Sequence, residues 1–291
     1  MNRFSLLFYR LRGILSSFSL RHQTLEERCK KIETSLPIPN NDLFMEFDLV
    51  SGNPWSPVVS SAITTYYSCL FDIARQESPK KILEIGTAFG MSAAALLKSS
   101  RNIELFISID LGIFSDHYAF PQNNIDYARD HVHAWCHHHR ISVENVRFFQ
   151  ANTQPDGIGD NENAGNEITR WHQLPDLVRL LNQNKFDIIF IDGKHTGDGL
   201  LNDFVTFWPF LKEGGLVICD DLHDGTRYKD IFPWAGQTLH SFHRFSELKK
   251  EEIADSCIWN FPQVIPGGDL GLRPFGLVRK NRNGSNNVGI S

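Results

Sequence analysis

The sequence predicts an α/β protein with a doubly wound, mostly parallel seven-stranded β-sheet whose last strand runs antiparallel. From Lys80 onward, short apolar runs rich in β-branched residues alternate with amphipathic segments of helix length. The first five runs are apolar almost throughout, as expected of parallel strands that helices cover on both faces. A glycine-containing turn joins the first run to a segment of helix-forming residues. These observations favour successive β–α–β units.

Five strands follow from these runs, at residues 81–85, 105–109, 146–149, 186–191 and 216–219. Two later β-rich runs, at residues 257–261 and 275–279, flank a turn rich in proline and glycine. We expect this pair to close the sheet as an antiparallel hairpin. Ahead of the first strand, residues 58–73 predict a helix.

The chain divides into an N-terminal arm and connector (residues 1–57), a main domain (58–280) and a frayed tail (281–291). Apolar residues between positions 4 and 18 recur at helical spacing, with serine and arginine opposite, and predict an amphipathic helix. Arg10 and Arg12 interrupt the run, which is too short to span a membrane. The helix would either touch a membrane surface weakly or pack on the domain or on a second subunit.

Composition excludes several classes of protein. With 291 residues, 41% of them hydrophobic and 22% charged, the chain can bury a large core and is not disordered. A net charge of −5 argues against a general nucleic-acid binder. Its five cysteines include no CxxC pair, so neither a zinc ribbon nor a disulfide framework is indicated. A reducing cytoplasm fits this pattern best.

The turn after the first strand reads Glu84-Ile-Gly-Thr-Ala-Phe-Gly-Met-Ser92. Gly86 permits a tight turn, Gly90 allows a ligand close to the backbone, and the following helix offers free N–H groups to an anion. Asp110 ends the second strand, where an acidic side chain can hold ribose hydroxyls. A nicotinamide-dinucleotide fingerprint needs glycine at Ala88 and Met91, so that reading is disfavoured.

With these motifs, residues from about 58 to 280 resemble the class I S-adenosylmethionine-dependent methyltransferases, which have a Rossmann-like fold. The resemblance implies that Ser92 and the helix N-terminus take the cofactor carboxylate, Asp110 the ribose, and residues 150–152 a place near adenine. The cofactor-binding residues it implies are Glu84, Gly86, Thr87, Gly90, Ser92, Asp110 and Asp192.

Acidic residues also follow the fourth and fifth strands. Asp192 comes directly after the fourth strand, and Asp220 and Asp221 follow the fifth. Because the carboxyl ends of parallel strands open onto one crevice, the three carboxylates can converge there. Oxygen ligands favour a hard cation such as Mg²⁺. The alternative is that one aspartate caps a helix and another is solvated.

This second group of motifs resembles the metal-dependent O-methyltransferases of the catechol, caffeoyl-CoA and macrolide-sugar types. The resemblance implies a magnesium site at Asp192, Asp220 and Asp221. The Asp192-Gly-Lys-His195 string is similar to the macrolide-sugar branch, in which a histidine is the base. The longer string from Ile191 to Gly215 resembles a further branch associated with glycan and natural-product genes, in which metal dependence is not assured.

The expected reaction is therefore methyl transfer to a hydroxyl of a small sugar-containing or natural-product acceptor. A metal would orient the hydroxyl and lower its pKa, and His195 would accept the proton. His223 is the competing base. Two alternatives stay open: a metal-independent methyltransferase in which Asp192 contacts only the cofactor amino group, and a cofactor-binding subunit without chemistry.

Overall fold

The computed structural model describes most of the main domain and one helix of the N-terminal segment. The described residues are 23–35, 62–112, 124–155, 169–225, 236–264 and 270–282. The predicted amphipathic helix between positions 4 and 18 lies outside these residues, as does most of the predicted tail.

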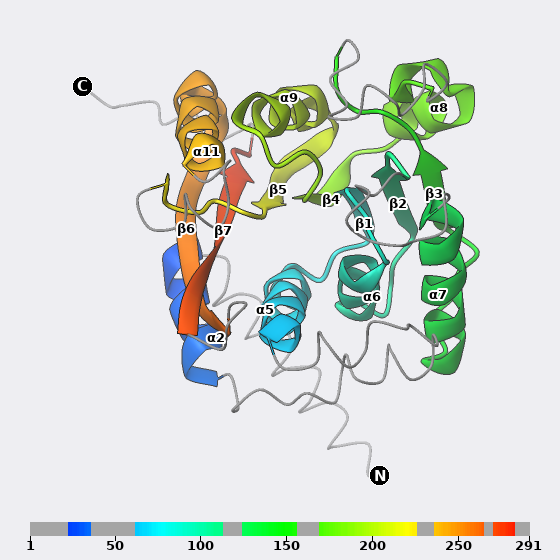
Figure 1. The fold of residues 1–291 in the computed structure, drawn as a ribbon, viewed down its shortest axis with the longest axis horizontal. Helices are drawn as coiled ribbons and strands as arrows, with labels where there is room; N and C mark the ends of the chain where they lie inside the picture. Colours follow the sequence, from blue (N-terminus) through cyan, green and yellow to red (C-terminus); the bar gives the residue numbers. More distant parts are fainter. Residues whose placement is uncertain are drawn as a thin grey trace.

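Seven strands form one sheet in the order β3-β2-β1-β4-β5-β7-β6 (Figure 1). The first five run parallel, β7 is antiparallel to β5, and β6 is antiparallel to β7. The strands are β1 Lys81–Ile85, β2 Leu105–Asp110, β3 Val146–Gln150, β4 Phe186–Ile191, β5 Leu211–Cys219, β6 Ile253–Val264 and β7 Leu270–Lys280. The predicted fold class is confirmed, including the hairpin that closes the sheet.

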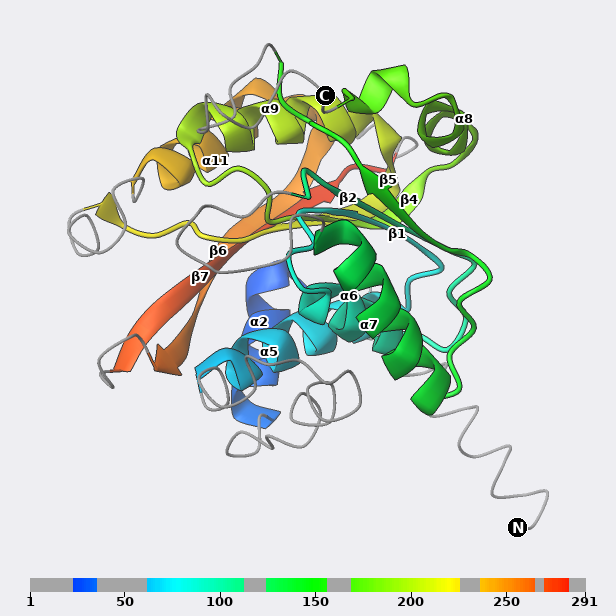
Figure 2. The same ribbon diagram turned by 45° about the vertical axis from the view of Figure 1, so that its right-hand side comes forward.

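Helices cover both faces of the sheet (Figure 2). On one face lie α2 Leu25–Ser35, α5 Ala62–Glu77, α6 Met91–Lys98 and α7 Asn124–His138. On the other lie α8 Pro175–Gln183, α9 Gly197–Phe207 and α11 Gln237–Leu248. Short 3₁₀ turns at Trp171–Gln173, Trp208–Phe210 and Lys250–Glu252 complete the connections.

The alternation of side chains along each strand explains why two helical layers are needed. In β1, Ile82 packs into the core on the α5–α6–α7 side, whereas Leu83 and Ile85 pack into the core on the α9–α11 side. All three are at most 1% exposed. A strand buried on both faces is apolar along most of its length, which is the signal that predicted these strands.

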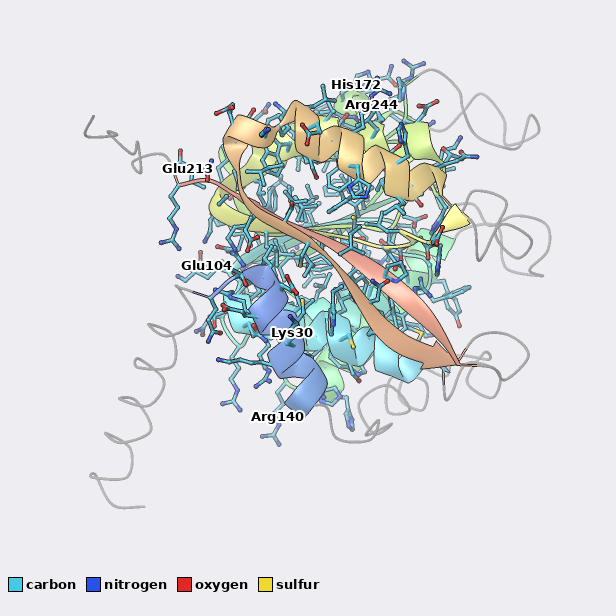
Figure 3. The ribbon with its side chains drawn as sticks, turned by 90° about the vertical axis from the view of Figure 1, so that its left-hand side faces the viewer. Lys30, Glu104, Arg140, His172, Glu213 and Arg244 are labelled. Carbon is cyan, nitrogen blue, oxygen red and sulfur yellow. The ribbon has the colours of Figure 1, made fainter. Side chains whose placement is uncertain are left out.

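Helix α2 packs on the domain although it lies within the predicted arm. Its buried residues Leu25, Cys29 and Ile32 join the core on the α5 side of the sheet. The Asp255 side chain on β6 accepts a hydrogen bond from the Leu25 backbone N–H at 2.7 Å. Figure 3 shows α2 lying against the twisted β6–β7 hairpin. Among the described helices, none is both long enough and apolar enough to cross a membrane.

Candidate functional site

The site lies where the strand order reverses, between β1 and β4, which is where open α/β sheets bind ligands. The Asp192 N–H donates to the Ile85 carbonyl at 2.8 Å, and the Asp220 N–H donates to the Ile191 carbonyl at 3.0 Å. These bonds hold the carboxyl ends of β1, β4 and β5 side by side. The residues that follow the three strands therefore lie side by side at the carboxyl edge of the sheet, which is the position of the ligand crevice in open α/β sheets.

Gly86 fits this crevice for two reasons. Its φ of +88° lies in the left-handed region that favours glycine. A Cβ at Gly86 would also lie 2.0 Å from the Asp192 carbonyl oxygen. The first turn therefore packs directly against the end of β4, and only glycine allows this approach.

Gly90 is needed for helix packing. Its φ is +87°, and a Cβ there would lie 2.5 Å from Cγ2 of Val132 on α7. The group that approaches the Gly90 backbone is thus helix α7, whereas the sequence predicted that a ligand would approach it. Gly90 also stands at the N-cap of α6. Its place in cofactor binding stays a prediction.

Asp110 orders the glycine turn. One oxygen, Oδ2, accepts hydrogen bonds from the backbone N–H groups of Thr87 (2.7 Å) and Ala88 (3.1 Å). The other, Oδ1, accepts from the Gly112 N–H at 2.6 Å. A carboxylate oxygen can accept two such bonds, so Oδ1 keeps capacity for one further donor. This arrangement is compatible with a ribose hydroxyl at Asp110.

Glu84 lies buried beneath the turn in a small polar cluster. Its Oε2 accepts from the Ser108 hydroxyl (2.7 Å) and the Thr87 hydroxyl (3.3 Å). Burial raises the pKa of Glu84 to about 7, although hydrogen bonds from Ser108, Ser92 and Thr87 act to lower it. Its Oε1 has no hydrogen-bond partner among the described residues. Glu84, Thr87 and Ser92 therefore support the turn from inside the core.

The acidic residues after β4 and β5 converge with His195, as the sequence predicted. The Nδ1 atom of His195 contacts Oδ2 of Asp221, and its Nε2 lies 3.8 Å from Oδ1 of Asp192. Asp221 has a left-handed φ of +60°, which is uncommon for a residue other than glycine. The Thr238 hydroxyl holds this conformation by donating to the Asp221 carbonyl at 2.6 Å.

Arg273, on β7, is part of the same cluster, and sequence reasoning missed it. Its Nε donates to Oδ1 of Asp220 at 3.1 Å, and its Nη2 contacts Oδ2 of the same carboxylate. The Nη2 atom also lies 3.4 Å from Oδ1 of Asp221. The guanidinium carbon stands 4.2 Å from the ring centroid of Tyr66. Tyr66, also unpredicted, donates its hydroxyl to Oδ2 of Asp192 at 3.4 Å.

These contacts set the protonation of the cluster. Burial, and then the neighbouring Asp220 carboxylate, raises the pKa of Asp192 well above its ordinary value. Burial acts to raise the pKa of Asp221 as well, but Arg273 and His195 outweigh it and hold that pKa well below the usual range. Burial lowers the pKa of His195, yet the Asp221 carboxylate more than compensates and raises it to about 9.

His195 is better placed than His223 to meet a ligand. His223 Nε2 lies 3.3 Å from Oδ1 of Asp221, so both histidines share one carboxylate. The His195 side chain is 39% exposed, whereas that of His223 is only 5% exposed. Of the two candidate bases, His195 is the one open to the crevice.

Another buried carboxyl, that of Asp203 on α9, packs against the turn that carries His195. If Gly193 carried a Cβ, that atom would lie 3.1 Å from Oδ2 of Asp203, so the two residues are in close contact. Among the described residues, this Oδ2 atom has no hydrogen-bond partner. Its Oδ1 accepts from the Gln154 side chain at 3.0 Å. Burial raises the pKa of Asp203 to about 7. The residue thus joins the loop after β3 to the turn after β4.

The predicted magnesium ligands do not form an oxygen-only set. Ligand atoms of Asp192, His195 and Asp221 lie within 4.8 Å of one another and are spaced for a metal ion. Asp220 is outside this group, and Arg273 contacts both of its oxygens. Both Asp221 oxygens also contact His195, His223 or Arg273. Mg²⁺ prefers oxygen ligands in octahedral geometry, so these residues as arranged do not fit it.

Comparison with known proteins identifies a methyltransferase domain over part of the chain. Residues 83–222 match a family model described as a methyltransferase domain. An uncharacterized protein, R132, of Acanthamoeba polyphaga mimivirus is 25% identical over 174 residues, which cover 59% of this chain and 65% of that protein. The chain thus covers slightly less than two thirds of that relative.

Solved structures share the fold. An O-methyltransferase from Bacillus cereus in complex with SAH has a TM-score of 0.51 and 17% identity, and the match covers 90% of this chain and all of that one. Cofactor-bound Rv0187 from MTB has a TM-score of 0.50 and 14% identity, with 85% of this chain and 99% of that chain covered. At such identities the likeness establishes the fold alone.

Proposed function

From the premise that this chain carries a methyltransferase domain on the fold of the class I S-adenosylmethionine-dependent methyltransferases, we propose that it is an O-methyltransferase with His195 as its base. The acceptor is a hydroxyl of a small molecule, of the sugar-containing or natural-product type, and the reaction takes place in the cytoplasm.

One observation carries this proposal: the His195–Asp221 pair opens onto the crevice at the point where the glycine turn meets β4. The space that a Cβ of Gly86 would need is filled by the Asp192 backbone. The imidazole is three residues further along the chain and 3.8 Å from the Asp192 carboxylate. The proposed base, His195, therefore lies beside the glycine turn that is predicted to bind the cofactor.

The residues around the turn fit S-adenosylmethionine. Asp110 keeps an acceptor position on Oδ1, and the N-terminus of α6 follows Gly90. Anionic groups such as the cofactor carboxylate are favoured at helix N-termini. Asp192, at the end of β4, is available to the cofactor amino group. When bound, this cofactor supplies a methyl group activated by the positive charge on sulfur.

The protein's own side chains orient the acceptor and accept its proton. Asp221 accepts a hydrogen bond from Nδ1 of His195 and so leaves Nε2 directed toward the crevice. Because Asp221 raises the pKa of His195 to about 9, the neutral ring is a stronger base than free imidazole. This matters because an aliphatic hydroxyl is a poor acid. Most of the remaining assistance is positioning.

Magnesium takes no part in the steps above, since the carboxylates of Asp220 and Asp221 are already engaged by Arg273 and the two histidines. A divalent ion at this cluster would have to displace at least one of these groups.

A methyl-transfer assay tests the proposal. The full chain is incubated with S-adenosylmethionine and panels of sugar, phenol and natural-product alcohols, and release of S-adenosylhomocysteine is measured. We expect turnover with at least one hydroxyl acceptor, and loss of most of it in His195→Ala with cofactor affinity unchanged. Tight cofactor binding without turnover on any hydroxyl would favour a non-catalytic subunit, and full activity of His195→Ala would remove the assigned base.

A further inference from the structure

The carboxylates of the acidic cluster lie close enough together to need a neighbouring positive charge. Asp192, Asp220 and Asp221 follow adjacent strands and face one crevice, and the Asp220 side chain is fully buried. Carboxylates this close repel one another unless a positive charge stands between them. In many such clusters the charge is a bound metal ion.

Arg273 is positioned to supply that charge. Its guanidinium approaches Asp220 through two nitrogens, Nε at 3.1 Å and Nη2, in the two-pronged geometry that suits a carboxylate. The same Nη2 reaches Oδ1 of Asp221 at 3.4 Å. One side chain therefore bridges both acidic residues that follow β5.

Aromatic packing and strand pairing also fix the position of the guanidinium. Tyr66, which is 2% exposed, lies under it at 4.2 Å and packs against Phe275 with ring centroids 5.0 Å apart. Strand β7 is fixed beside β5 by pairing of Gly276 with Cys219. A Cβ at Gly276 would lie 2.5 Å from the Cys219 sulfur, so the two strands are in close contact. These features make Arg273 a rigid part of the site.

We propose that Arg273 is the resident cation of this cluster, taking the place of a divalent metal, and that it positions Asp221 and, through Asp221, His195. The catalytic half of this inference rests on the proposed O-methyltransferase function, whereas the ion-binding half rests on the contacts alone. It follows that the native chain has no high-affinity Mg²⁺ site at the cluster, and that removal of Arg273 creates one.

Ion binding tests the inference without any activity. Tb³⁺ luminescence sensitised by nearby tyrosine, and Mg²⁺ calorimetry, are measured on the full chain and on Arg273→Met and Arg273→Lys. Arg273→Met keeps a long side chain without the charge, and Arg273→Lys keeps the charge. We expect Arg273→Met to bind either ion at least about tenfold more tightly than the native chain, because the positive charge that contacts Asp220 and Asp221 has been removed. Arg273→Lys should stay close to the native chain.

Arg244→Gln is the matched control, since Arg244 is exposed on α11, away from the cluster (Figure 3). It should bind ions as the native chain does. Native binding as tight as, or tighter than, that of Arg273→Met would overturn the proposal. If Arg273→Met does not fold, the native chain and Arg273→Lys decide: saturable Mg²⁺ binding to the native chain contradicts the proposal, and its absence supports it.

Turnover gives the second readout once an acceptor is known. The native chain should keep its activity in EDTA, whereas Arg273→Met should lose about 100-fold in kcat and recover part of it with Mg²⁺. Loss of native activity in EDTA, restored by Mg²⁺, would refute the inference and leave the proposed function standing. Failure to methylate any acceptor would refute the proposed function, and the ion-binding result would still decide the role of Arg273.

Discussion

The Nδ1 atom of His195 contacts Oδ2 of Asp221, although the two residues are 26 positions apart, with helix α9 and strand β5 between them. Parallel strands β4 and β5 end beside one another, so the turns that follow them meet. The contact fixes which ring nitrogen faces the crevice and sets the proton affinity of the ring. Several measurable properties depend on it.

The first is the pH dependence of turnover. The pKa of His195 is raised from 6.5 to about 9, so the ring is mostly protonated at neutral pH and cannot act as a base. We expect kcat/KM to rise about tenfold per pH unit below pH 8 and to level off near pH 9. A profile that levels off near pH 6.5 would contradict the contact with Asp221. In His195→Ala the residual rate should lack this limb.

The second is the effect of Asp221→Asn. The amide keeps the size of the side chain but removes the charge that favours the protonated imidazole. We expect the rising limb of the pH profile to move down toward pH 6.5, together with a loss of about 100-fold in kcat at pH 9. Asp130→Asn, on the exposed face of α7, serves as the control and should leave the profile unchanged. An unshifted limb would mean that Asp221 does not set the proton affinity of the base.

The sequence predicted the parallel part of the sheet because strands such as β2 and β4 are buried on both faces and are therefore apolar along most of their length. For the same reason it located Asp110, Asp192, Asp220 and Asp221 at strand ends. It also predicted that Asp192 would converge with the acidic residues after β5, since neighbouring parallel strands end together.

Arg273 lies beyond what the sequence could reveal. It is 53 positions from Asp220, and the two meet only because β7 runs antiparallel to β5 in one particular register. The register of β7 against β5 depends on how both faces of the strands pack. The proline- and glycine-rich turn before β7 does not indicate this register. For α2, in contrast, a signal was present: Leu25, Cys29 and Ile32 stand at the i, i+4 and i+7 spacing of a buried helix face.

The third prediction concerns the glycine turn. In Gly86→Ala the new Cβ would meet the Asp192 carbonyl 2.0 Å away, and alanine would also be strained at a φ of +88°. We expect a loss of about 3 kcal/mol or more in the free energy of unfolding, or displacement of the turn with loss of cofactor binding. Urea denaturation and cofactor calorimetry measure the two outcomes.

Ala88→Gly is the matched variant for this turn. Ala88 is exposed and already has a φ of +47°, so glycine relieves strain without removing a packed side chain. Its stability should stay within about 1 kcal/mol of the native value. A loss in Gly86→Ala no larger than that in Ala88→Gly would mean that neither the approach to Asp192 nor the left-handed φ makes Gly86 necessary.

The last prediction concerns how the N-terminal helix is attached to the domain. Glu77, at the end of α5, contacts Arg28 of α2 at 2.6 Å and Arg279 of β7 at 2.7 Å, and all three side chains are at most 17% exposed. Glu77→Gln would remove the carboxylate that both largely buried arginines contact, so we expect the free energy of unfolding, measured by urea denaturation, to fall by about 3 kcal/mol. Glu104→Gln, at a residue labelled in Figure 3, removes an exposed ion pair with Lys80 and should cost less than about 1 kcal/mol. A loss in Glu77→Gln no larger than that of Glu104→Gln would mean that apolar contacts of Leu25, Cys29 and Ile32 hold α2 in place without help from the ion pairs.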